Sequence, residues 1–291
     1  MKYLIVILYI LIQNDIMSQD MSTMLNEAEQ PVREYTKSTF KSTRVINTHS
    51  IETLGNRTLD FRITHHFGNL NTDDVLQSFF GLDYANIRLG LEYSYNGRCM
   101  IGIGRTKIDG LTDAFIKTRL LRQTTDNKMP VSLTWMSGVY YVTSKYYLGI
   151  TDFKLTNRLQ YAHQVIIARK FSEKFSLQVA PMLLYYNLVQ MYSDDNHKFA
   201  ILGASRLKIT KRTAVTLEYN LQASKFSSNN GISYHNSAGI GFDIETGGHV
   251  FQLFFTNSTG IAETQFVNYT QVDIFKGNIL IGFNISRVFK V

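Results

Sequence analysis

Hydrophobic and polar residues alternate with a period of two at the C-terminal end of the chain. Between Ile279 and Val291 the odd positions are apolar except Arg287, and the even positions are mostly small or polar. Such alternation over about thirteen residues predicts a β-strand with one apolar face. Strands of soluble proteins usually have five or six residues, whereas a membrane-spanning strand needs about 9–11. The length therefore favours a transmembrane β-barrel over a soluble β-sandwich.

The same alternation recurs upstream, for example at 58–67, 87–95 and 215–222, whereas both faces are apolar around 165–168 and 182–186. We predict about twelve strands, near 58–67, 85–95, 98–106, 111–122, 130–142, 155–170, 175–190, 198–209, 214–223, 232–245, 249–256 and 278–291. An even number places both ends of the barrel on the periplasmic side. Counting 43–51 would give thirteen strands, so we expect residues 20–57 to form a periplasmic lead-in or a lumen plug.

The connections between these strands alternate in length. Asn96-Gly97 is a strong hairpin signal, and other short turns fall at 172–174, 210–213 and 246–248. Longer connections fall at 68–84, 143–154, 191–198, 224–231 and 257–277. Transmembrane barrels have short periplasmic turns and longer extracellular loops. Two connections break the alternation: 107–110 is short and 123–130 is longer. The predicted fold is an all-β transmembrane antiparallel barrel over 58–291.

The first residues read as an export signal. Met1-Lys2 is followed by an apolar run, Tyr3 to Ile12, which is short for a spanning helix but suited to a signal peptide. We expect a signal peptide over 1–19, cleaved near Ser18 or Gln19; the alternative is an uncleaved anchor. No later stretch approaches the ~18 apolar residues of a spanning helix. These features predict the outer membrane of a Gram-negative bacterium, with its lipid around the barrel.

Composition removes several other classes of protein. Charged residues make up 18% and aromatic residues 13%, which excludes a disordered chain. One Cys excludes an intrachain disulfide scaffold. The formal net charge is +7, but the basic residues are spread along the chain and the protein is predicted to be exported. We therefore expect no nucleic-acid partner.

Several runs of the sequence also resemble a known family. They are Ser42 to Ser50, Leu59 to Gly68, Phe80 to Tyr93, Ile167 to Ser172, Gly241 to Leu253 and Gly282 to Phe289. These segments resemble a domain-of-unknown-function β-barrel family of Bacteroidetes-type bacteria, and the resemblance covers about 40–291. It implies an outer-membrane barrel. The family has no established activity, so the resemblance implies no functional residue.

Facing the apolar side of each strand outward places a set of charged residues and histidines in the lumen. An Arg or Lys facing lipid at the midplane costs about 2–4 kcal/mol, which decides this orientation. The candidate lumen-lining residues are Asp60, Arg62, His66, Arg88, Glu92, Lys117, Arg119, Arg158, Glu218, His235, Asp243 and Glu245. They would line a polar pore, or form an ion-pair network that fills the barrel.

Other chemistry has weaker support. The seven His are scattered without zinc-ligand spacing, so we expect no metal and no cofactor. Ser237 and His235 share a face, but the sequence has no Gly-x-Ser-x-Gly elbow, and we expect no enzyme. The Gly102-Ile103-Gly104 run lacks the third glycine of a phosphate loop.

Three hypotheses remain from the sequence. The first is a porin-like channel or transporter for a small polar or anionic solute. The second is a plugged structural barrel that docks a periplasmic or surface protein. The third, with the weakest support, is an outer-membrane lipid hydrolase.

Overall fold

The computed structural model describes residues 34–70, 81–144, 154–189, 191–227 and 232–291. Residues 36–291 form one compact unit, with which the following account is concerned. The predicted signal peptide, 1–19, lies outside the described residues.

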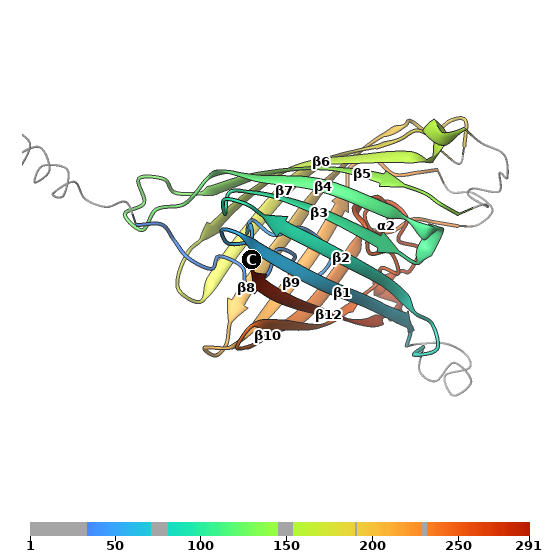
Figure 1. Ribbon diagram of the computed structural model, residues 1–291. Helices are drawn as coiled ribbons and strands as arrows, with labels where there is room; N and C mark the ends of the chain where they lie inside the picture. Colours follow the sequence, from blue (N-terminus) through green and yellow to red (C-terminus); the bar gives the residue numbers. More distant parts are fainter. Residues whose placement is uncertain (1–33, 71–80, 145–153, 190, 228–231) are drawn as a thin grey trace, which may run out of the picture. The chain divides into compact units, whose positions relative to one another are not determined.

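Twelve antiparallel strands of this unit close into a barrel, in which β12 pairs with β1 (Figure 1). The strands are β1 Thr58–Asn69, β2 Asn86–Ser94, β3 Cys99–Thr106, β4 Thr112–Leu121, β5 Ser132–Tyr141, β6 Leu159–Lys170, β7 Phe175–Tyr186, β8 His197–Lys208, β9 Thr213–Gln222, β10 Ser237–Thr246, β11 His249–Thr256 and β12 Leu280–Lys290. The loops add η1 Ile108–Gly110, η2 Leu155–Arg158, α2 Glu263–Phe266 and η3 Ile274–Lys276. The predicted all-β barrel of twelve strands is confirmed.

The two ends of the barrel differ in their connections. At one end, called the turn end below, short turns join β2 to β3, β6 to β7, β8 to β9 and β10 to β11. Gly97 has a φ of 73°, which glycine adopts without strain, and the Asn96 side chain caps the N–H groups of Arg98 and Cys99. The opposite end, called the loop end, carries the longer connections and the short η1 segment.

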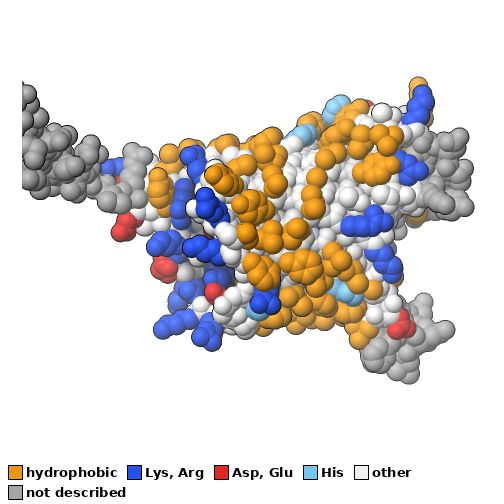
Figure 2. Space-filling model, viewed as in Figure 1, with side chains coloured by type: hydrophobic (Ala, Val, Ile, Leu, Met, Phe, Trp, Pro, Cys, Tyr) orange, Lys and Arg blue, Asp and Glu red, His pale blue; other side chains and the backbone are white. Residues whose placement is uncertain are grey.

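The outer face of the wall is apolar because strand residues alternate between the two faces. Leu89, Ile103 and Leu217 are each about half exposed. Figure 2 shows a broad belt of apolar side chains, with Lys and Arg gathered at the turn end. The basic side chains of the turns include the exposed Arg98, Lys174, Lys211 and Arg212. Such a belt fits a hydrocarbon layer flanked by headgroups.

The interior holds a segment of the chain that is not part of the wall. Residues 36–57, called the plug hairpin below, contact the turn end at both of their ends: Thr36 donates to the Gln123 carbonyl, and Val291 donates to that of Arg57. Inside, the Val45 N–H bonds the Thr48 carbonyl and Arg44 pairs with His49 in an antiparallel bridge. Residues 43–51 are thus a tight turn within the barrel rather than a thirteenth wall strand.

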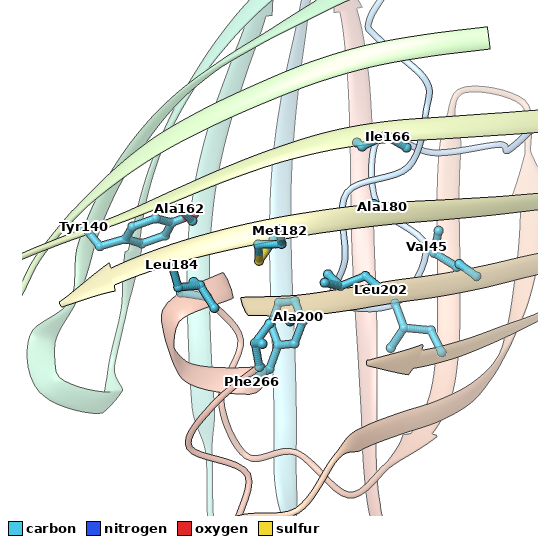
Figure 3. Close-up of a cluster of buried hydrophobic side chains, with 14 of the residues drawn as sticks. Val45, Tyr140, Ala162, Ile166, Ala180, Met182, Leu184, Ala200, Leu202 and Phe266 are labelled. Atoms are coloured by element: carbon cyan, nitrogen blue, oxygen red, sulfur yellow. The ribbon is translucent and has the colours of Figure 1, made fainter. Parts of the chain in front are cut away.

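A second segment enters from the loop end. Residues 257–270 of the β11–β12 connection, called the inner loop below, are almost all buried and include α2. The small and apolar inward residues of β6, β7 and β8 pack against both inserted segments (Figure 3). This cluster includes Val45 of the plug hairpin and Phe266 of the inner loop. It explains why β6 and β7 are apolar on both faces: one face meets lipid and the other meets the inserted chain.

Within the described residues, no helix has the length and apolar character needed to cross a membrane.

Candidate functional site

Buried ion pairs line β1 to β4 inside the barrel. Arg88 donates two hydrogen bonds to Asp113, of 2.8 and 2.6 Å, and Arg62 lies 3.0 Å from Asp60. All four side chains are almost fully buried. Gly104 leaves room for this arrangement, because a Cβ there would collide with the Arg88 guanidinium. The paired charges neutralise one another on the wall itself.

Glu218 of β9 holds the tip of the plug hairpin. One of its carboxylate oxygens accepts hydrogen bonds from the N–H groups of Ile46, Asn47 and Thr48, at 3.2, 3.0 and 2.9 Å. Three successive N–H groups converging on one oxygen form the kind of concavity that binds anions in proteins. The buried charge of Glu218 is thereby stabilised by the main chain of the plug hairpin.

Other wall side chains also bind the main chain of this segment. Gln178 accepts from the Ile51 N–H at 3.0 Å and donates to the His49 carbonyl at 2.7 Å. Further contacts join Lys117 to the carbonyls of Thr43 and Glu52, Gln252 to that of Val45, Asn284 to that of Ile46, and Thr134 to that of Ile51. They come from β4, β5, β7, β11 and β12. The plug hairpin is therefore held from most sides of the barrel.

A buried cluster joins the plug hairpin to the inner loop. Arg44 of the plug hairpin donates to Glu263 of the inner loop at 2.8 Å, and Tyr140 of β5 donates to the other oxygen of that carboxylate at 2.7 Å. The His49 Nε2 lies 3.4 Å from Glu263 and 3.2 Å from Arg44 Nη2. The segments entering from the two ends thus meet at one carboxylate.

His49 is fully buried in this cluster. Burial lowers its pKa well below the usual 6.5, and the nearby Arg44, Lys117, Arg88 and Arg62 act in the same direction. The imidazole is therefore neutral at pH 7, and it packs edge-on against Phe115 with ring centroids 4.7 Å apart.

The candidate residues named from the sequence fall into three groups. Those buried inside the barrel wall are Asp60, Arg62, His66, Arg88, Glu92, Lys117, Glu218 and Asp243. Two are partly exposed and pair with the plug hairpin: Arg119 lies 3.5 Å from Glu52, and Glu245 lies 2.6 Å from Lys41. All of these belong to strands β1, β2, β4, β9 and β10.

The predicted positions of Arg158 and His235 need correction, because both residues lie outside the strands in which the sequence analysis placed them. Arg158 belongs to η2 and donates to the carbonyls of Val142 and Ser144, so it stabilises the β5–β6 connection. His235 precedes β10, and its carbonyl accepts from Gln222. Both predicted strands were too long at the loop end, where polar side chains satisfy the backbone in place of a strand partner.

The sequence-based set omitted the uncharged polar residues that contact the plug hairpin. Gln178, Gln252 and Asn284 all lie at inward positions of the same period-two pattern. That pattern could have indicated them had amides been considered along with charges. Arg44 and Glu263 carry no such signal, because they lie in segments without periodicity.

The plug hairpin leaves a small cavity beside it. This cavity of about 220 Å³ lies against β1, β11 and β12 and is lined by Asp60, Arg62, Lys41 and Glu52 among others. A larger, apolar groove of about 520 Å³ involves Leu177, Val179, Leu217, Tyr219 and Ile240. These five side chains belong to the exposed apolar face, so we assign the groove to the lipid-facing wall.

Catalytic or metal chemistry finds little support. The Ser237 hydroxyl accepts from Asn220 at 2.7 Å, so it serves the wall network. A hydrogen bond between Ser137 and His163, 2.8 Å long, joins β5 and β6 at exposed positions. Among the residues that the structure describes, no group of three His, Cys, Asp or Glu is placed to hold a metal ion.

Together, the closed barrel, the apolar belt and the polar interior define a membrane-bound β-barrel of the outer membrane. The chain belongs to the membrane-bound β-barrel domain family of unknown function (DUF5777), whose family model matches residues 40–289. A search of curated proteins found no match.

Solved structures of outer-membrane porins and channels are similar to this chain at very low sequence identity. The NanC porin is 9% identical, with a TM-score of 0.52, over 80% of this chain and 100% of that one. An outer membrane channel from Pseudomonas putida F1 is 12% identical, with a TM-score of 0.47, over 82% of this chain and 98% of that one. The KdgM porin is 6% identical, with a TM-score of 0.46, over 80% and 99%. The similarity to the NanC porin shows the fold alone.

Proposed function

We propose that the protein is an outer-membrane channel for a small polar solute and that the plug hairpin and the inner loop hold it closed. Opening requires the plug hairpin to leave the interior of the barrel through the turn end. The proposed function includes no catalytic step.

The observation that carries this proposal is what fills the barrel. The centre of the barrel is occupied by a chain segment bound through hydrogen bonds and ion pairs, beside the wall's own side chains. When the plug hairpin leaves, the separated polar groups form hydrogen bonds to water instead. These new bonds offset much of the free energy lost when the hydrogen bonds within the protein break. When the segment leaves, the polar inward faces of β1, β2, β4 and β9 remain, together with the apolar inward faces of β6 to β8.

The charge of that wall favours a polar solute over a strongly anionic one. Arg88 remains paired with Asp113, and Arg62 with Asp60, because both members of each pair belong to strands. Lys117 and Glu218 both lose their main-chain partners and have opposite charges. The open lumen is then close to neutral along β1–β4 and β9, and we expect weak ion selectivity.

Planar-bilayer recording of the full-length chain tests the proposal. The wild-type protein should be mostly silent. Ile46→Asp places a carboxylate beside Glu218 and should release the plug hairpin, giving stepwise conductance with a small reversal potential. Release is measured separately as maleimide labelling of Thr48→Cys in a Cys99→Ser background, because Thr48 is fully buried when docked.

Two results decide between the proposal and its alternative. Labelling together with conductance supports a channel. Labelling without conductance, in a protein whose heat-modifiable migration shows a folded barrel, overturns it and favours a structural barrel that docks a periplasmic or surface protein.

A further inference from the structure

We propose that the solute is a peptide, bound through its main chain, and that the plug hairpin occupies this peptide site as an internal ligand. This inference rests on the proposed channel function and names the class of its substrate.

The Glu218 carboxylate supplies the first argument. It accepts from three consecutive N–H groups, those of Ile46, Asn47 and Thr48. Consecutive converging N–H donors are a property of a peptide main chain in a tight turn. A neutral sugar presents hydroxyl groups at other spacings, and an inorganic anion would be repelled by Glu218.

Gln178 supplies the second argument. Its side-chain amide both accepts from the Ile51 N–H and donates to the His49 carbonyl. A carboxamide pairing with two peptide groups reproduces the exchange of hydrogen bonds that an adjacent β-strand provides. Gln252 and Asn284 donate to two further carbonyls, at 2.7 and 3.0 Å. The side-chain amides of the wall thus take the place of the main-chain groups that a neighbouring β-strand would offer to the plug hairpin.

The side chains at the tip of the plug hairpin take little part in this recognition. The Asn47 Oδ1 and Thr48 Oγ1 are buried without a hydrogen-bond partner among the described residues. Ile46 is apolar and packs toward Gly239, where an added Cβ would lie 3.0 Å from its Cδ1. At the tip, the site binds the main chain and leaves these side-chain oxygens without a partner, which suits peptides that vary in sequence at these positions. Farther along the segment the wall also binds side chains, since Arg62 donates to the hydroxyl groups of Ser42 and Thr43.

The wall also offers an amide that the plug hairpin does not use. Gln164 of β6 is 1% exposed and faces the interior, next to the strand that carries Gln178. Neither its Oε1 nor its Nε2 has a hydrogen-bond partner within the described part of the chain. A buried polar group without a hydrogen-bond partner lowers the stability of the folded protein. A guest longer than the hairpin turn would satisfy them as Gln178 is satisfied.

The test uses the released full-length variant and a synthetic probe. The probe is a fluorescent, end-blocked decapeptide with the sequence of residues 42–51. Its matched control carries N-methyl groups on the three amides corresponding to 46–48, which removes the donors to Glu218 and leaves the side chains in place. Maltohexaose serves as a polar, non-peptide probe. The variant is Ile46→Asp, or Arg44→Ala with Ile46→Asp if maleimide labelling requires both for release.

Fluorescence anisotropy in detergent measures the affinity of the released variant for each fluorescent peptide. We expect the decapeptide to bind at least tenfold more tightly than its N-methylated form, and Glu218→Leu in the released variant to remove that difference. In bilayers the decapeptide should block the open variant at concentrations at which maltohexaose does not.

Failure of this inference is distinguishable from failure of the channel. Equal affinity for the decapeptide and its N-methylated form, or equal block by maltohexaose, overturns the peptide site while the conductance stands. A released variant that never conducts overturns the channel, and tight Glu218-dependent peptide binding would then still identify a peptide-binding barrel.

Discussion

Arg44 Nη1 lies 2.8 Å from Glu263 Oε1, and this contact joins the two segments that enter the barrel from opposite ends. Both side chains are nearly fully buried, at 3% and 1% exposure. Neither residue belongs to a wall strand. The closed state therefore includes an ion pair between the two insertions, in addition to the bonds that the wall makes to the plug hairpin.

Glu263→Gln should loosen the plug hairpin. The substitution leaves the buried guanidinium of Arg44 without its counter-charge, and breaking one side of a buried pair costs about 3–5 kcal/mol. We expect labelling of Thr48→Cys to accelerate at least tenfold while the barrel stays folded. Lys128→Ala is the control, because Lys128 and Asp126 form an exposed pair at 3.7 Å in a turn. An unchanged labelling rate in Glu263→Gln would contradict the role of the pair.

Glu218→Ala should release the three amides that this carboxylate holds. Each buried N–H left without an acceptor costs about 1–3 kcal/mol. Hydrogen exchange measured by mass spectrometry should rise by at least tenfold in a peptide covering residues 46–48. Thr216→Val is a matched control on the same strand, since the Thr216 hydroxyl faces inward without a hydrogen-bond partner among the described residues. Similar exchange in the two variants would show that Glu218 does not hold the tip.

The wall could be predicted from the sequence because lipid on one side imposes a strict period of two. Strand β11 has the predicted bounds, and β1, β2 and β3 differ from theirs by no more than two residues. The outward phase follows from the cost of exposing charge to hydrocarbon, which predicts that Arg62, Arg88 and Lys117 face inward. All three side chains are buried.

The seat of the plug hairpin could not be predicted in the same way. Many of its contacts with the wall are made by main-chain groups, which every residue carries, so these contacts leave no trace in residue type. Glu218 lies about 170 positions from its partners at the tip. Only the apolar inward faces of β6 and β7 hinted at a second buried surface, since the lumen of a water-filled barrel would not need Ile166 or Leu184.

Leu217→Arg should destabilise the barrel in a way that depends on depth. Leu217 lies on the exposed apolar face near the middle of β9, where a lipid-facing Arg costs about 2–4 kcal/mol. Ile209, equally outward but just beyond the end of β8 at the turn end, provides the control substitution Ile209→Arg, with an expected cost of about 0–1 kcal/mol. Urea unfolding in phospholipid vesicles measures both. An equal loss of stability in the two variants would contradict the placement of Leu217 near the bilayer midplane and of Ile209 near its surface.

Acid should weaken docking of the plug hairpin through His49. The docked imidazole has a pKa well below 6.5 because it is buried, with Arg44 beside it, whereas the released imidazole has an ordinary pKa near 6.5. Below that pH the released state binds a proton that the docked state does not, so stability of the docked state falls as pH falls. The loss begins near pH 6.5 and approaches about tenfold in the docking equilibrium per pH unit, until the docked pKa is reached.

The measurement is the labelling rate of Thr48→Cys between pH 8 and pH 5, corrected for the intrinsic pH dependence of the thiol with a free cysteine peptide. His49→Gln is the matched variant, because it keeps a polar side chain and removes the titrating ring. The wild-type histidine should give corrected labelling that rises toward pH 5, and the glutamine variant should give a flat profile. A rise that persists in His49→Gln would assign the acid sensitivity to other groups around the cluster, and a flat wild-type profile would show that Glu263 accepts the protonated ring without cost.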